Sequence, residues 1–330
     1  MTNRTTRRHF FAVAAASAVA AALHGAALAQ PAWPSRPITL IVPYNAGGAS
    51  DFGARLIASD LSSRLGQPVI VENVAGAGGA LGVQRLLRAE TDGHTLLYGS
   101  LSETVMVPIV NAAAARYRSQ DLLPIAMTGK TPVAFVTRPD FPANTMDELV
   151  AMLRKRPGGL TYGSPGVGTF QHVMAETVKA RTATFMVHIP YRGGSNIVND
   201  VVSGQIDVGV TTAPNVAPLV GAGRIKALGV SSRERIPALK DTQSFGETES
   251  LKSLDLQTWG MVFARSGTPD AVVRRLNAAI NEVLMQPKTQ ATLQKAGAAL
   301  ARPLSVEEAK AFFEAEAAAY RPIAERIKPE

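Results

Sequence analysis

Short apolar segments alternate with helical periodicity along most of the chain, and this alternation constrains the fold more than any other feature. The apolar runs 38–42, 68–72 and 95–98 are typical of buried strands, and the segment 52–65 between the first two has apolar residues at helical spacing. Strands that alternate with helices in this way predict βαβ units and a mostly parallel sheet.

The middle of the chain repeats this plan. The further strands that we expect are 132–136, 160–162, 186–189, 206–210 and 227–230. The further helices that we expect are 81–89, 145–153, 169–180, 269–284 and 306–327. Because both halves have βαβ character, the sequence predicts two α/β domains with a ligand cleft between them, a common position for small-molecule sites.

The N-terminal residues 1–29 have the plan of an export signal. A basic start that includes Arg7 and Arg8 precedes the apolar run 10–23 and the small-residue cleavage site 27–29. The arginine pair favours twin-arginine export, although an ordinary secretory signal also tolerates two arginines. The apolar run is too short for a membrane span. We therefore expect a protein that is exported to the periplasm, with its signal peptide removed.

Composition excludes several classes of site. The chain has no cysteine, so disulfides, thiolate metal sites and a cysteine nucleophile are excluded. Its formal net charge is +8, and loss of the three signal arginines leaves +8 − 3 = +5. Beyond the signal there is no dense basic run and no interleaving of aromatic and basic residues. We therefore expect a solvated basic surface and no nucleic-acid partner.

Three glycine-rich loops, 44–50, 163–168 and 192–195, each follow an apolar strand and open a helix. Ligands of open α/β sheets bind at the carboxyl ends of strands, and free N–H groups at helix N-termini hold an anion without a cation. Three such loops at one cleft would suit a carboxylate; alternatively, the glycines only form tight turns. None of the loops has the Gly-Lys-Ser/Thr ending of a phosphate-binding P-loop.

A bound cofactor and an active site are both weakly indicated. Gly76, Gly78 and Gly82 resemble a dinucleotide fingerprint, but the third glycine is one residue late. We therefore expect no cofactor and keep dinucleotide binding as a minor alternative. Pro165 directly follows Ser164, which removes an N–H that an oxyanion hole would use. The histidines of the mature chain do not form a cluster at metal-ligand spacing, so no metal site is predicted.

Four side chains near the loops have two interpretations each. Asp51 is either a carboxylate stabilised in the first turn of its helix or a group that orients the loop or accepts from a ligand donor. Arg192 either pairs with a ligand carboxylate or is an exposed turn residue. His172 lies one turn into its helix and either reaches the cleft or is structural. Trp259 either packs between the domains or forms a cleft wall.

An ordered set of motifs along the chain resembles the tripartite tricarboxylate transporter receptors, also called the Bug family. The motifs include 41–48 with Asp51, 65–69, 160–164 with Gly168, Thr169 and His172, 188–191, 204–207 and 266–269. The resemblance covers essentially the whole mature chain. It implies an α/β fold of the type II-like periplasmic-binding-protein kind, with two domains joined by crossover strands. By similarity, domain 1 comprises 31–131 plus 255–330, and domain 2 comprises 132–254.

The resemblance also implies a function. It predicts a solute-binding receptor, without enzymatic activity, that captures a small carboxylate for a tripartite tricarboxylate-type transporter. The ligand classes are di- and tricarboxylates, acidic amino acids and aromatic acids, and the partners are the membrane permease subunits. We expect a monomer. The alternatives are an exported enzyme on a similar fold and a ligand-binding sensor for a signalling system.

Family receptors hold the ligand carboxylate with backbone amides and ordered waters, from loops that here contain 46–48, 168–169 and 192–193. This sequence departs from the family pattern at Asn45 and Arg192, and at 102–121 and 211–212, so we expect ligand specificity to be set there. The residues expected to contact the ligand are Tyr44, Asn45, Ala46, Gly47, Gly48, Asp51, Ser100, Gly168, Thr169, His172, Arg192, Gly193 and Thr212.

Overall fold

The computed structural model describes residues 33–299 and 302–327. Residues 36–330 form one compact unit by backbone contacts. The predicted signal peptide lies outside the described residues. Within the described ranges, no helix combines the length and the apolar character that a membrane span requires.

A nine-stranded mixed sheet forms the framework of this unit, in the order β2-β1-β3-β9-β4-β7-β5-β6, with β8 paired to β4. The strands are β1 (Ile38–Val42), β2 (Val69–Asn73), β3 (Thr95–Ser100), β4 (Leu122–Thr137), β5 (Thr161–Ser164), β6 (Val187–Pro190), β7 (Val208–Thr212), β8 (Lys226–Val230) and β9 (Gln257–Arg265). β1 pairs in parallel with β2 and β3, and β5 pairs in parallel with β6 and β7. The predicted α/β architecture is therefore confirmed.

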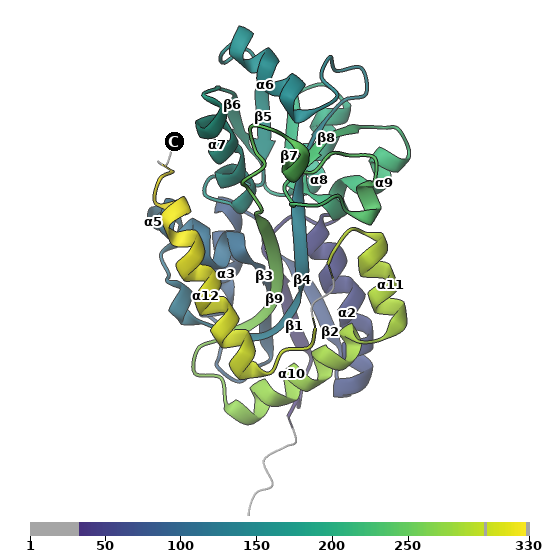
Figure 1. Ribbon diagram of the computed structural model, residues 1–330. Coiled ribbons are helices and arrows are strands. Elements are labelled where there is room, and N and C mark those ends of the chain that lie inside the picture. The colour runs from purple at the N-terminus through teal and green to yellow at the C-terminus, as the bar shows by residue number, and fades with distance from the viewer. Residues whose placement is uncertain (1–32, 300–301, 328–330) are drawn as a thin grey trace, which may run out of the picture. The chain divides into compact units, whose positions relative to one another are not determined.

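Two long antiparallel strands, β4 and β9, join the parallel parts of the sheet and run side by side (Figure 1). β9 pairs with β3 on one side and with β4 on the other. β4 pairs with β9 through Leu122–Pro132 and with β7 and β8 through Val133–Thr137. We call β1, β2, β3, β9 and residues 122–132 the first half of the sheet, and the rest of β4 with β5–β8 the second half. The domain boundaries at 131/132 and 254/255 remain a prediction.

Helices pack on both halves of the sheet. The helices are α2 (Ala49–Leu65), α3 (Ala80–Leu87), α4 (Val107–Val110), α5 (Ala112–Ala115), α6 (Met146–Lys155), α7 (Phe170–Thr182), α8 (Gly194–Val202), α9 (Ala213–Gly221), α10 (Asp270–Leu284), α11 (Pro287–Lys295) and α12 (Val306–Ala324). α2 packs on β1 and β2, α12 and α10 pack on β4, and α8 and α9 pack on β7 (Figure 1). A π-helical turn, Ser102–Met106, precedes α4.

An aromatic cluster fixes β9 to the C-terminal helix α12. Trp259 is 1% exposed, and its ring centroid lies 5.8 Å from that of Phe312 and 5.9 Å from that of Phe313. The indole Nε1–H donates a hydrogen bond to Glu316 Oε2 over 2.9 Å. Trp259 therefore packs the crossover strand β9 against the C-terminal helix α12, and it also contributes to a pocket described below.

Removal of this indole is expected to destabilise the fold. Trp259→Ala leaves a large cavity and removes the hydrogen bond to Glu316, so we expect a loss of about 3–5 kcal/mol in the free energy of unfolding. Urea denaturation followed by circular dichroism measures this value. The control is Ile70→Ala on the edge strand β2, where the side chain is 54% exposed, and we expect a change within about 0.5 kcal/mol. Equal losses in the two variants would contradict the role given to Trp259.

Candidate functional site

A pocket lies between the two halves of the sheet, with the crossover strands β4 and β9 in its wall. With its open mouth included, it encloses about 860 Å³. None of the 24 residues that line it in the described part of the chain is charged. The lining residues that carry side-chain polar groups are Tyr44, Ser50, Tyr98, Ser100, Thr128, Thr131, Gln171, Thr212, Asn215, Thr258 and Trp259. Gly48, Ala49 and Gly194 also line the pocket and lie at the starts of helices.

Three helix N-termini converge on this pocket. The N-cap residues of α2, α8 and α9 are Gly48, Gly193 and Thr212; the two glycines have no side chain to cap their helices, and the Thr212 side chain does not cap α9. A Cβ built on Gly48 would lie 3.8 Å from Asn215 Oδ1 and 3.9 Å from Gly194 N, so the first turns of the three helices meet around this glycine. The first N–H groups of a helix lack intrahelical partners and lie at the positive end of its dipole. This arrangement suits an anion without a cationic side chain.

The first and third loops predicted from the sequence touch each other across the pocket mouth. The Asn45 amide donates to Asn196 Oδ1 over 2.7 Å, and the Asn45 backbone N–H donates to the Arg192 carbonyl over 3.2 Å. The Ser195 hydroxyl donates to the Ala46 carbonyl over 3.3 Å. The Arg192 side chain is exposed and is absent from the pocket lining. These bonds join the two halves, so the structure represents a closed arrangement of the loops.

The second loop, residues 163–168, contributes less to the pocket than the sequence predicts. Thr169 and His172 are fully buried, and they and Gly168 are absent from the pocket lining. The Thr169 hydroxyl accepts from the His172 N–H, and His172 Nδ1 accepts from the Gly168 N–H over 3.2 Å. These groups cap α7 and shape its loop, and only Pro165 of the loop reaches the pocket. The geometry does not support a ligand contact for Gly168, Thr169 or His172. The contact of these residues with a ligand remains a prediction.

Asp51 orients the first loop. Its carboxylate accepts from the Gly47 N–H over 3.0 Å and from Arg55 Nε over 3.0 Å. Burial alone would raise the pKa of Asp51, but the hydrogen bonds from Arg55 and Gly47 outweigh it and hold the pKa below its usual value. Gly47 has φ +78°, a conformation that glycine adopts without strain. Of the two interpretations, the structure supports loop orientation, and Asp51 is absent from the pocket lining.

A buried carboxyl group that the sequence did not reveal lies behind the pocket. Glu103, in the π-helical turn, is fully buried and accepts from the Tyr44 hydroxyl and the Ser100 hydroxyl, each over 2.7 Å, and from the Ser100 N–H. Burial raises the pKa of Glu103 to about 7, although the bonds from Ser100 and Tyr44 work to lower it. Tyr44 and Ser100 line the pocket, so Glu103 fixes two of its walls and places a titratable charge one layer behind them.

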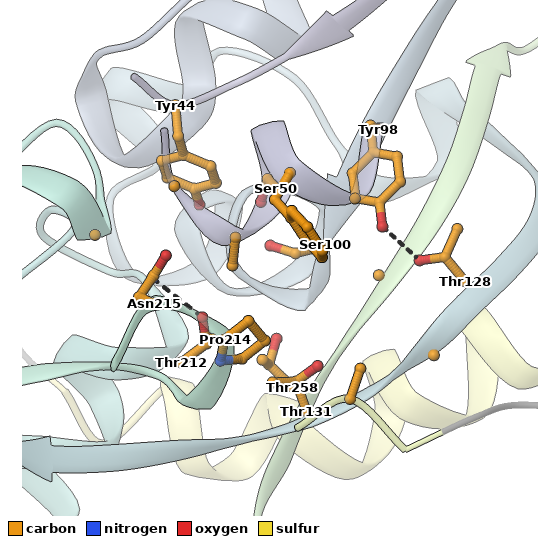
Figure 2. A pocket seen from close by; sticks show the side chains of 18 of the residues that line it. Tyr44, Ser50, Tyr98, Ser100, Thr128, Thr131, Thr212, Pro214, Asn215 and Thr258 are labelled. Atoms are coloured by element: carbon orange, nitrogen blue, oxygen red, sulfur yellow. Dashed lines mark hydrogen bonds between the residues drawn. The ribbon is translucent and has the colours of Figure 1, made fainter. Parts of the chain in front are cut away.

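Hydroxyl groups dominate the part of the pocket formed by the crossover strands. The Tyr98 hydroxyl donates to Thr128 Oγ1 over 3.1 Å, and Thr131 lies opposite Thr258 in the β4–β9 ladder. Figure 2 shows these four side chains around the same pocket as Ser100. A Cβ on Gly260 would lie 2.5 Å from Thr128 Oγ1, so any larger residue at this position would clash with the threonine hydroxyl.

The structure shows one serine–histidine contact, but it is not placed for catalysis. Ser164 Oγ lies 2.7 Å from His188 Nε2. Ser164 is fully buried, His188 is 9% exposed, and both are absent from the pocket lining. A substrate in the pocket would therefore not reach the hydroxyl. Within the described residues, no group of three or more histidines, cysteines or acids could hold a metal ion.

Four of the thirteen residues expected to bind ligand line the pocket, namely Tyr44, Gly48, Ser100 and Thr212. Asn45, Ala46 and Gly193 belong to the loop contacts at the mouth. The first turn of α9 was missed, although Thr212 followed by a proline in the first turn is a helix-start signal. Thr131 and Thr258 were also missed, because their strand register is not visible in the sequence.

Comparison with known proteins gives a consistent match. A profile described as tripartite tricarboxylate transporter family receptor matches residues 53–328. BugT of Bordetella pertussis is 34% identical over 256 residues, which cover 76% of this chain and 77% of BugT. MatC from Rhodopseudomonas palustris, solved with bound malate, has a TM-score of 0.84 at 27% identity. The match covers 88% of this chain and 100% of the MatC chain. A second Rhodopseudomonas palustris protein, solved with adipate, has a TM-score of 0.85 at 27% identity. That match covers 90% of this chain and 100% of the second protein. The predicted fold class, a two-domain type II-like periplasmic binding fold, is confirmed by these neighbours.

The raised pKa of Glu103 predicts a pH-dependent stability. The fold favours the protonated form of Glu103. The stabilisation that this form gives the fold is therefore complete below the usual pKa near 4.5 and is lost as the pH rises through about 7. We expect Glu103 to lower the free energy of unfolding by up to about 3 kcal/mol between pH 5 and pH 8.

Urea denaturation of the wild type and of Glu103→Gln at both pH values tests this expectation. The glutamine variant should lose most of the decrease, because its amide does not titrate. Glu90→Gln, at a side chain that is 82% exposed, is the control and should behave like the wild type. A decrease that persists unchanged in Glu103→Gln would show that other groups cause it.

Proposed function

The chain belongs to the tripartite tricarboxylate transporter family of receptors, and on that premise we propose that it captures a small carboxylate and delivers it to the permease subunits of such a transporter. The resemblance of its motifs to this family is confirmed by the profile match and by BugT. The family and fold are those of solute-binding receptors, not of enzymes. Two structural neighbours were solved with malate and adipate, which supports a carboxylate as the ligand.

The observation that carries the proposal is the convergence of three uncapped helix N-termini on a pocket without charged lining residues. A carboxylate near Gly48 would accept from the first N–H groups of α2, α8 and α9. Such charge-assisted hydrogen bonds are stronger than neutral ones. The hydroxyl of Ser50, which lines the same pocket, adds a further donor.

Closure of the two halves around the ligand is the proposed mechanism. The ligand carboxylate would contact α2 from the first half and α8 and α9 from the second half only when the halves are together. Binding therefore shifts the population toward the closed form. The Asn45–Asn196 bond and the Ser195–Ala46 bond would then lock the mouth. The closed form is the form that we expect the permease to recognise.

The export and domain assignments complete the proposal. Receptors of this family are periplasmic, and we propose the same location, with residues 1–29 as the signal peptide and a monomer as the working state. We propose that domain 1 comprises 31–131 plus 255–330 and that domain 2 comprises 132–254. The change of β4 partners at residues 132–133 supports the first boundary.

A thermal-shift screen against carboxylates tests the proposed function. The panel contains di- and tricarboxylates, acidic amino acids and aromatic acids, with a nicotinamide dinucleotide as control. A ligand that binds only the native state raises the melting temperature, so we expect a clear shift for one acid class. A shift for the dinucleotide alone, with no shift for any acid, would overturn the proposal.

Gly48→Val tests the location of the carboxylate. Gly48 has an ordinary φ of −89°, and its added Cβ would meet only van der Waals contacts of 3.6–3.9 Å, so the fold should tolerate it. The branched methyl groups would fill the space between the helix N-termini, and we expect the affinity to fall by at least about tenfold. Gly221→Val, in open space at the end of α9, is the matched control. Isothermal titration with the acid found in the screen measures both, and an unchanged affinity for Gly48→Val would place the carboxylate elsewhere.

A further inference from the structure

The crossover strands present a hydroxyl group that the carboxylate site does not use. Thr258 of β9 lines the pocket and is 5% exposed, and its Oγ1 has no hydrogen-bond partner among the described residues. Its register partner across the ladder is Thr131 of β4, so both side chains lie on the same face of the sheet (Figure 2). A buried hydroxyl without a partner is costly. This observation points to a ligand group that pairs with it.

The surroundings of Thr258 are uncharged and partly apolar. Leu293, Ala296 and Ala298 line the same pocket. Ala299 forms a β-bridge with Lys130, which brings the neighbouring Ala298 beside this part of β4. The compartment therefore combines two threonine hydroxyls with aliphatic side chains, and it suits an uncharged polar group at the end of an apolar segment.

A second carboxylate would be poorly accommodated at this position. The pocket-lining helix N-termini meet around Gly48, and the backbone of β4 and β9 is paired in the ladder. The pocket lining of the described chain holds no cationic side chain. Two hydroxyl groups do not replace the hydration of a carboxylate, and burial of an unpaired charge is far more costly than burial of a neutral polar group. A hydroxyl or carbonyl group, by contrast, is satisfied by one or two partners.

We propose that the ligand is a monocarboxylate whose far end carries a neutral hydroxyl or carbonyl group, and that Thr258 recognises this group. The inference rests on the proposed function, because the carboxylate held at the helix N-termini determines which end of the ligand reaches Thr258. The Thr258 hydroxyl can donate or accept, so it pairs with either kind of group. A ligand with a plain apolar end would bury this hydroxyl without a partner.

Matched sets of acids test the inference by isothermal titration of the purified protein. One set is hexanoate, its ω-hydroxy derivative and adipate; the other is benzoate, para-hydroxybenzoate and terephthalate. We expect the hydroxy acid of at least one set to bind about tenfold more tightly than both the plain acid and the dicarboxylate, since a hydrogen bond made in a desolvated site has this order of effect. Tightest binding of a dicarboxylate, or equal binding of hydroxy and plain acids, would overturn the inference.

A pair of variants assigns the preference to one hydroxyl. Thr258→Val should abolish the preference for the hydroxy acid over the plain acid, because valine offers no hydrogen bond to the far end of the ligand. The matched control is Thr137→Val, which removes another fully buried hydroxyl without a partner among the described residues, at the end of β4 and outside the pocket lining. This control should keep the preference. Circular dichroism checks that both variants fold.

The outcomes separate this inference from the proposed function. If carboxylates bind but Thr258→Val keeps the preference for the hydroxy acid, the role of Thr258 is wrong and the receptor function stands. If neither the matched sets nor the screening panel yields a carboxylate that binds, the proposed function fails and the inference fails with it.

Discussion

The antiparallel pairing of β4 with β9 is the interaction on which the rest of the structure depends. β9 connects this pair to β3 and the first half, and the continuation of β4 pairs with β7 and β8 in the second half. The same ladder forms the pocket floor, because Gly129 lies opposite Gly260 and Thr131 lies opposite Thr258. A single set of backbone hydrogen bonds therefore positions both walls of the pocket, and Trp259 fixes it to α12.

Local sequence predicted the parallel strands, most of their helices and the second part of β4 at 132–136, but not the first part of β4 or β9. The runs that form β1 and β7 are apolar and end at glycine-rich or polar turns, so their periodicity identifies them. The first part of β4 contains Pro124, Gly129 and Pro132, residues that usually interrupt strands. Irregularities in the register between Pro124 and Ala126 and between Met127 and Gly129 accommodate Pro124 and Gly129. Its partner β9 is far away in the sequence, so no local pattern reveals the pairing.

The candidate site was predictable only in part, for a physical reason. Glycine-rich turns after strands indicated the loops before α2 and α8, whose N-caps lack side-chain bonds. The loop before α7 has the same pattern, but Thr169 and Ser102 satisfy its free N–H groups from within the protein. Whether a helix N-terminus is available to a ligand depends on such contacts with distant segments. For the same reason Glu103, which bonds to Tyr44 from another loop, was not identifiable.

The absence of charged residues from the described pocket lining has a consequence for the medium in which the protein works. Dissolved salt screens exposed charges within a few ångströms to tens of ångströms, but it hardly weakens hydrogen bonds and helix dipoles inside a closed pocket. A site built on lysine or arginine attracts its anion from a distance and loses that attraction in brine. This pocket has no charged side chain in its described lining to attract an anion from a distance. Its affinity for a bound anion should therefore change little with salt concentration.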